Sequence, residues 1–132
     1  MAEERFSLRV PAAAAYVGTA RIFGGAIARQ VGLSEDDVDD VKLAISEACA
    51  AGVREDGDGT IGLVAERDGA ILAFEIVGED IPPPLSDDLV ATPESFRRSV
   101  GYDVIRSLFP DAAILSEGDR SGRIRFAVPI GG

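Results

Sequence analysis

The residues with the clearest potential for chemistry lie in the segment from Asp39 to Ala51, which reads as part of a helix. Glu47 and Ala51 are four residues apart, so they share one face of that helix, one turn from each other. A carboxylate such as Glu47 can act as a general base. The sequence has no histidine, which excludes Ser-His-Asp triads, histidine bases and histidine-containing zinc sites. Any chemistry must therefore rely on carboxylates or on a bound ion.

The helix that carries Glu47 is expected to begin after Ser34, a good N-cap residue, and to place three acidic residues in its first turn, where the helix dipole favours them. One apolar stripe consists of Val38, Val41, Ile45 and Cys49. A second, displaced from the first, consists of Leu43, Glu47 and Ala51. A helix that is apolar on two sides is mostly buried. Glu47 is therefore expected in or beside a cavity.

The remaining elements must position this helix. Residues 5–10 alternate as a strand, and a helix with an apolar stripe follows it (Tyr16, Ala20, Phe23, Ile27 and Val31). Gly18, Gly24 and Gly25 weaken the propensity of that helix, and close packing against another element is the expected reason for them.

The second half of the chain predicts two hairpins and a third helix. Thr60–Arg67 and Ala70–Val77 flank Asp68-Gly69, a strong hairpin signal. Gly78–Thr92 contains three consecutive prolines and is expected to be a loop or lid. A helix then opens at Pro93 and ends at Phe109-Pro110, and the runs 112–116 and 123–130 form a final hairpin. The order predicts an α/β (α+β) two-layer sandwich, in which three helices cover one face of a mostly antiparallel sheet.

Size and composition favour one domain over residues 1–132, because 46% of the residues are hydrophobic. Thirteen Lys and Arg against 23 Asp and Glu give a net charge of −10, which opposes direct nucleic-acid binding. The lone Cys49 permits no intramolecular disulfide and suits a buried apolar position. No apolar run approaches the roughly 20 residues of a membrane helix. A cytoplasmic protein without membrane contact is expected.

Two segments, Ala44-Ile45-Ser46-Glu47-Ala48-Cys49 and Ser99–Leu108, together with the order of the elements, resemble the anti-sigma regulatory factors. These form the serine-kinase branch of the GHKL ATPases and have the Bergerat fold. The resemblance implies a protein that keeps a sigma factor from RNA polymerase. It also implies an antagonist protein, which active members phosphorylate on serine with Mg-ATP, and a homodimer formed through the sheet.

The resemblance assigns roles to individual residues of a nucleotide site and shows where the motifs have degenerated. Glu47 takes the position of the general base, and Ala51 replaces the asparagine that holds Mg²⁺, so no metal ligand remains there. After the third strand, Gly78 stands where an aspartate binds adenine, and Asp80 and Pro82 stand where glycines belong. A register shift could instead offer Glu79 or Asp80 to adenine.

The third motif of this family is a Gly-x-Gly that opens the last helix and cradles phosphates with its backbone amides. Ser99 and Gly101 preserve it in part. Arg97 and Arg98 could contact an anion there, or could form a solvated face. These changes predict a degenerate nucleotide site that is empty of ATP and Mg²⁺.

The resemblance also implies a residue for partner binding, Arg21. In the family, an arginine of the first helix contacts the sigma factor and the competing antagonist, and Arg21 matches it by position. An arginine on an amphipathic helix can also be an ordinary polar-face residue.

Three functions stay open at this point. The first is a kinase-dead anti-sigma factor regulated by partner switching, that is, by competition from the antagonist. The second is an active Mg-ATP-dependent serine kinase, in which water, Glu55 or Asp56 replaces the lost metal ligand. The third is a small structural protein whose Glu47 is a hydrogen-bonded buried acid and which binds no sigma factor.

Overall fold

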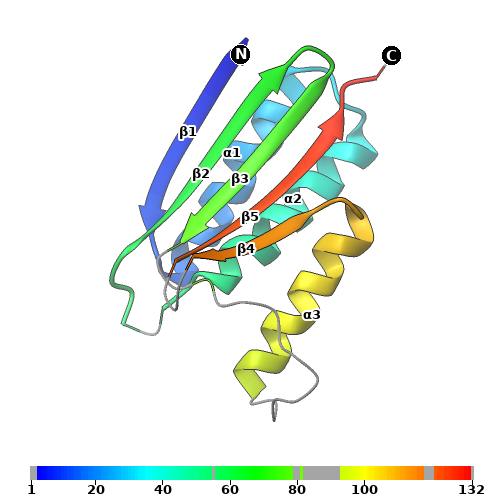
Figure 1. Cartoon of the computed structure of the whole chain (residues 1–132). Helices are drawn as coiled ribbons and strands as arrows, with labels where there is room; N and C mark the ends of the chain where they lie inside the picture. The colour runs from blue at the N-terminus through cyan, green and yellow to red at the C-terminus, as the bar shows by residue number, and fades with distance from the viewer. Residues whose placement is uncertain (1–2, 55, 79–80, 82–92, 118–120, 132) are drawn as a thin grey trace.

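A computed structural model of the chain describes residues 3–54, 56–78, 81, 93–117 and 121–131, and in residues 93–99, 116–117 and 121 it describes the backbone alone. The described elements form two layers, a five-stranded sheet and a layer of helices that covers one of its faces (Figure 1). The expected two-layer α/β sandwich is confirmed.

The sheet has the strand order β1-β2-β3-β5-β4, and each neighbouring pair is antiparallel. The strands are β1 (Glu4–Pro11), β2 (Thr60–Asp68), β3 (Ile71–Gly78), β4 (Ala113–Glu117) and β5 (Ser121–Pro129). The expected hairpin between β2 and β3 is present. Asp68 pairs with Ile71 across a two-residue turn, in which Gly69 has a φ of 61°. Glycine adopts this left-handed conformation without steric cost.

The helical layer contains α1 (Val17–Gln30), α2 (Glu35–Ala51) and α3 (Pro93–Leu108), and a short 3₁₀ helix, η1 (Ala14–Tyr16), precedes α1. In Figure 1, α2 lies between α1 and α3. The described helices include none that is long and apolar enough to cross a membrane.

α2 begins where its N-cap signal predicts. The Ser34 hydroxyl accepts a hydrogen bond from the backbone N–H of Asp37 at 3.1 Å, which satisfies one of the N–H groups that a helix start leaves unpaired. The first apolar stripe of α2 is fully buried. The second stripe is buried only in part, because Leu43 is 44% exposed. The expectation that α2 is apolar and buried on both sides is therefore wrong at Leu43, which the neighbouring helices leave uncovered.

Two of the three glycines in α1 allow it to pack closely against α2. A Cβ on Gly24 would overlap Ile45 Cδ1, and a Cβ on Gly25 would lie 3.0 Å from Lys42 Cγ and Cδ. Gly18 differs, because a Cβ there would meet no atom within 4 Å. Close packing is therefore not the reason for that glycine. Tyr16 also departs from its predicted place in the buried stripe and is exposed at the end of η1.

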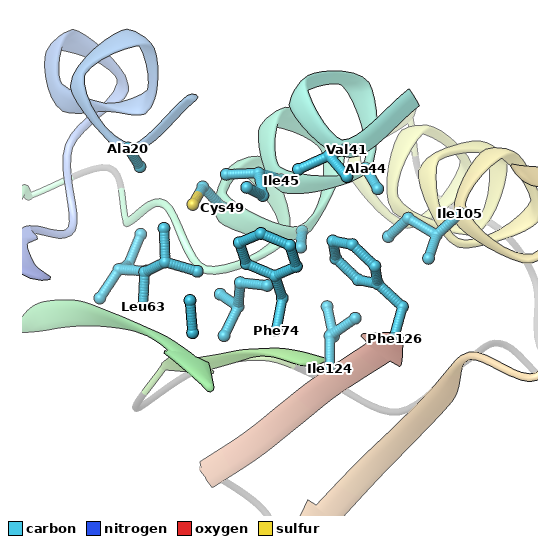
Figure 2. Close-up of a cluster of buried hydrophobic side chains, with 14 of the residues drawn as sticks. Ala20, Val41, Ala44, Ile45, Cys49, Leu63, Phe74, Ile105, Ile124 and Phe126 are labelled. Carbon is cyan, nitrogen blue, oxygen red and sulfur yellow. The ribbon is translucent and has the colours of Figure 1, made fainter. Parts of the chain in front are cut away.

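The core lies between the sheet and α2, and its aromatic centre is Phe126 (Figure 2). The Phe126 ring stacks on Phe74, with centroids 5.2 Å apart, and on Phe109, at 4.7 Å. Cys49 is buried in the same cluster, and this burial raises the pKa of its thiol to about 12. The expected reading of Cys49 as a buried, inert side chain agrees with this environment.

Candidate functional site

Glu47 lies in the last turns of α2 and is half-buried against α3. The residue of α3 that faces it is Gly101, because a Cβ on Gly101 would lie 2.7 Å from Glu47 Oε2 and 3.7 Å from its Cδ. The absence of a side chain at position 101 therefore creates the space that the carboxylate occupies. The structure thus brings together two of the residues that the sequence assigns to a nucleotide site.

We expect Gly101→Ala to displace the Glu47 carboxylate or to separate α2 from α3. Overpacking of this kind costs about 1–3 kcal/mol, partly offset by the roughly 1 kcal/mol by which alanine exceeds glycine in helix propensity. The matched control is Gly18→Ala, where a Cβ meets open space. That control should gain roughly 0.5–1 kcal/mol. Urea unfolding of both variants measures the difference. Equal stabilisation of the two would show that Glu47 does not require this gap.

Ala51 completes α2 one turn beyond Glu47 and is 5% exposed. Its methyl group offers no oxygen to a hard cation. Of the two acids proposed to replace the missing ligand, Glu55 lies outside the described residues. Asp56 is tied to Arg54, with Nε–Oδ1 at 3.3 Å, and accepts a hydrogen bond from the backbone N–H of Asp58 at 2.9 Å. The hydrogen bond from Asp58, and after it the contact with Arg54, hold the pKa of the Asp56 carboxyl below its ordinary value. Asp56 therefore already has a partner in this structure.

The described residues also contain no alternative metal site. Nowhere among them do three or more acidic or cysteine side chains lie close enough together to hold an ion.

The end of β3, where the adenine motif is expected, holds an apolar side chain. Ile81 is 1% exposed and lies between Gly52, Gly78 and Gly122, which come from the end of α2, the end of β3 and the start of β5. A Cβ on Gly78 would lie 2.8 Å from Ile81 Cγ1, and a Cβ on Gly122 would lie 2.8 Å from Ile81 Cβ. We call these three residues the glycine socket of Ile81.

The glycine socket gives Gly78 a packing role in this structure, since it admits the Ile81 side chain. The two other residues expected to contact adenine, Glu79 and Asp80, lie outside the described residues. The sequence reasoning missed Ile81, Gly52 and Gly122. The only signal that could have found them is the coincidence of three glycines at the ends of elements that meet in space.

Ser99 and Gly101 lie more than one turn inside α3, which begins at Pro93. Backbone N–H groups inside a helix are bonded within it, and only those of the first turn are free for an anion. The expectation that these two residues open the helix and cradle phosphate with their amides therefore does not fit α3 as observed. Six residues of α3, 93–98, precede Ser99.

Arg21 lies on α1 with an exposed side chain. Its neighbour Ile22 is 67% exposed, and Phe23 is half-buried against the core. Glu47 contacts α3, whereas α1 lies on the other side of α2 (Figure 1). Arg21 and Ile22 therefore belong to a separate, solvent-facing surface, where an exposed apolar side chain stands beside a cation.

The model of the histidine kinase-like ATPase domain matches residues 10–126 of this sequence. The chain belongs to this family. The match includes all three helices and extends from the end of β1 into β5, so the architecture and the family agree.

The curated relatives of this chain include serine-protein kinases named RsbW. The chain is 29% identical over 103 residues to the serine-protein kinase RsbW of Bacillus cereus (strain ZK / E33L). This match covers 76% of this chain and 61% of the relative. The same values hold for the serine-protein kinase RsbW of Bacillus thuringiensis subsp. konkukian. A shorter match is to the serine-protein kinase RsbW of Bacillus thuringiensis (strain Al Hakam), with 41% identity over 46 residues. It covers 35% of this chain and 29% of the relative. The chain thus spans about three fifths of the length of the first two relatives. The expected resemblance to the serine-kinase branch of the family is confirmed.

Proposed function

We propose that this protein is an anti-sigma factor that sequesters a sigma factor and regulates transcription by partner switching, with lost or impaired ATP binding and kinase activity. Two observations together support the proposal. The family model matches residues 10–126, and the Ile81 side chain occupies the glycine socket, at the place where the adenine-binding motif of the anti-sigma regulatory factors is expected. In this proposal the chain keeps the binding surface of the fold and has lost its nucleotide chemistry.

The donor set supports the nucleotide part of the proposal, because it does not fit Mg-ATP. Ala51 supplies a methyl group at the metal position, and Gly78 has no carboxylate for the adenine amino group. Phosphoryl transfer depends mainly on positioned charge and a metal ion. A protein without these groups has little means to stabilise the transferred phosphoryl group.

The partner part of the proposal is supported by the resemblance to the anti-sigma regulatory factors and by the surface of α1. We propose that Arg21 contacts the sigma factor and that an antagonist protein competes for the same region. We further propose that the protein acts in the cytoplasm, as a homodimer, without direct contact with nucleic acid. The net charge of −10 supports the last point, since it repels a polyphosphate backbone.

An active Mg-ATP-dependent serine kinase that phosphorylates the antagonist is the second candidate. The specific observation in its favour is that Glu47, the expected general base, is retained and only half-buried, in a space that Gly101 leaves open.

Calorimetric titration with ATP and Mg²⁺ separates the two candidates. We expect no saturable binding by the native chain up to about 1 mM ATP. We also expect none by Ala51→Asn alone, because that change supplies a metal ligand and leaves Ile81 in place. The double variant Ala51→Asn with Ile81→Ala tests whether the socket is the second obstacle. Micromolar, Mg²⁺-dependent binding by the native chain would contradict the loss of the nucleotide site and favour the kinase.

Co-expression with each sigma factor of the source organism tests the partner. We expect one of them to co-purify as a stable complex in the absence of ATP. Failure with every sigma factor would contradict the anti-sigma proposal and favour a structural protein.

A further inference from the structure

One edge of the sheet is open where β5 continues beyond β4. The last residue of β5 that pairs with β4 is Arg125, which lies opposite Ala113, whereas β5 runs on to Pro129 (Figure 1). The residues just before β4 do not extend its ladder with β5, since the pairing ends at Ala113 and the backbone N–H of Ala112 bonds to Phe109 O at 2.9 Å in a turn. Among the described residues, the final residues of β5 therefore have a strand neighbour, β3, on one side only.

Ala127 is the residue on this edge with both backbone groups, N–H and C=O, pointing away from β3. Ile130 N donates to Ala70 O at 2.6 Å, which continues the β3–β5 register and shows that even-numbered residues of β5 bond to β3. In an antiparallel ladder successive residues point their N–H and C=O groups to opposite sides. Ala127 therefore points both groups away from β3. Among the described residues, no backbone hydrogen bond outside the helices and strands involves it.

A groove of about 710 Å³ lies along this edge, within the size range of ligand sites. Its walls are five consecutive residues of β5, Arg125 to Pro129, the loop from Leu108 to Ala112, and the first turns of α2. Apolar side chains form most of the lining and include Phe109, Phe126 and the 44%-exposed Ile71. An exposed apolar groove beside unpaired strand groups is the arrangement that accepts an added strand.

The charged side chains that line the groove favour a basic ligand. Asp37 and Asp40 of α2 and Asp111 of the segment after α3 belong to the lining. Arg125 is the one cation among the described lining residues, and its Nε lies 3.4 Å from Glu75 Oε2 on the neighbouring strand. No described cation forms an ion pair with Asp37 or Asp40. The groove is therefore apolar at its floor and acidic at its rim.

We propose that this edge binds a short extended segment of a protein partner, in which apolar and basic residues alternate. The segment lies antiparallel to β5 and exchanges backbone hydrogen bonds with Ala127. Its apolar side chains contact Ala127 and Ile71 on the outer face of the sheet. Its basic side chains pass over Phe126 toward Asp37 and Asp40, with their aliphatic stems on the apolar floor.

Pro129 limits the length of this segment. It lacks an N–H, so it can offer the edge only its carbonyl, and prolines on edge strands prevent extended pairing. The site is thus suited to about four residues, and the proposal does not depend on the identity of the partner or on the proposed anti-sigma function.

The test uses the tetrapeptide Ac-Val-Arg-Val-Arg-NH₂ as the probe, with the ¹⁵N-labelled full chain observed by NMR. We expect saturable shifts centred on the Ala127 amide and slower hydrogen exchange of that amide. The acidic peptide Ac-Val-Glu-Val-Glu-NH₂ should bind at least about tenfold more weakly, because each partly exposed charge pair contributes up to about 1 kcal/mol. N-methylation of the second valine should weaken binding about three- to tenfold by removing one backbone hydrogen bond.

Variants of the protein locate the site. Ala127→Pro removes the edge N–H and leaves the β3 ladder intact, as Pro129 already does two residues later, whereas Ala127→Val keeps the N–H and is the matched control. Asp37→Asn with Asp40→Asn should remove most of the preference for the basic peptide. The peptide series keeps the test valid should Ala127→Pro fold poorly.

Three results would overturn the proposal. The first is the absence of binding at millimolar peptide, and the second is equal binding of the acidic and basic peptides. The third is a change in oligomeric state on Ala127→Pro with no effect of the peptides, since the edge would then join copies of this chain.

Discussion

Replacing Phe126 by alanine is expected to lower the free energy of unfolding by about 3–5 kcal/mol, the cost of truncating a buried aromatic side chain. Phe126 is 3% exposed and stacks on both Phe74 and Phe109. It therefore links β3, β5 and the segment after α3, and its removal leaves a cavity that three elements would have to close. A domain of this size has a total stability of about 5–15 kcal/mol, so the variant should remain folded at low temperature. Urea denaturation followed by circular dichroism measures the loss.

The matched control for Phe126 is Tyr16→Ala, which truncates an aromatic side chain at the exposed end of η1. Surface substitutions of this kind change stability by about 0.5 kcal/mol or less. Equal losses in the two variants would contradict the assignment of Phe126 to the centre of the core.

The elements that sequence predicted well are those whose signals are local. Ser34 caps α2 by accepting a hydrogen bond from the residue three positions later, and the hairpin predicted at Asp68-Gly69 closes one residue further on, at Gly69 and residue 70, between adjacent strands. Such contacts depend on a few adjacent residues, so their pattern is readable in one dimension. The order of elements then restricts the architecture to a small number of layered folds.

The features that sequence did not predict arise from contacts between distant segments. Gly101 was assigned to a phosphate loop, yet its neighbour in space is Glu47 on another helix. Leu43 fits the pattern of a buried stripe, but the described elements leave it 44% exposed. The glycine socket of Ile81 joins residues from α2, β3 and β5. In each case the role of a residue is decided by which element passes over it, which periodicity along one helix or strand cannot specify.

The two halves of the proposed function separate onto different parts of the fold. The altered nucleotide positions, Ala51 and Gly78, lie at the ends of α2 and β3, whereas Arg21 lies on the exposed side of α1. Changes at the first set leave the second surface intact. This separation explains how a chain of this family could lose phosphoryl transfer and keep a protein partner.

The second large effect concerns that surface. In the proposed complex, Arg21→Glu is expected to weaken sigma-factor binding by about 30-fold or more, since an arginine at the centre of an interface contributes 2 kcal/mol or more on truncation and charge reversal adds repulsion. Ile22, 67% exposed beside it, offers the apolar contact that commonly accompanies such a residue. Ile22→Ser should therefore weaken the complex as well. Surface plasmon resonance with the co-purifying sigma factor measures both losses.

Arg106→Glu is the control that isolates contact from charge. Arg106 is exposed on α3, and the substitution changes the net charge of the protein by the same amount as Arg21→Glu. Long-range electrostatic attraction would be altered similarly by the two variants and would appear mainly in the association rate at low salt. A direct contact at Arg21 instead raises the dissociation rate in that variant alone. Equal weakening by both variants would contradict the assignment of Arg21 to the interface, and loss of binding only on Arg21→Glu would place the sigma factor on α1.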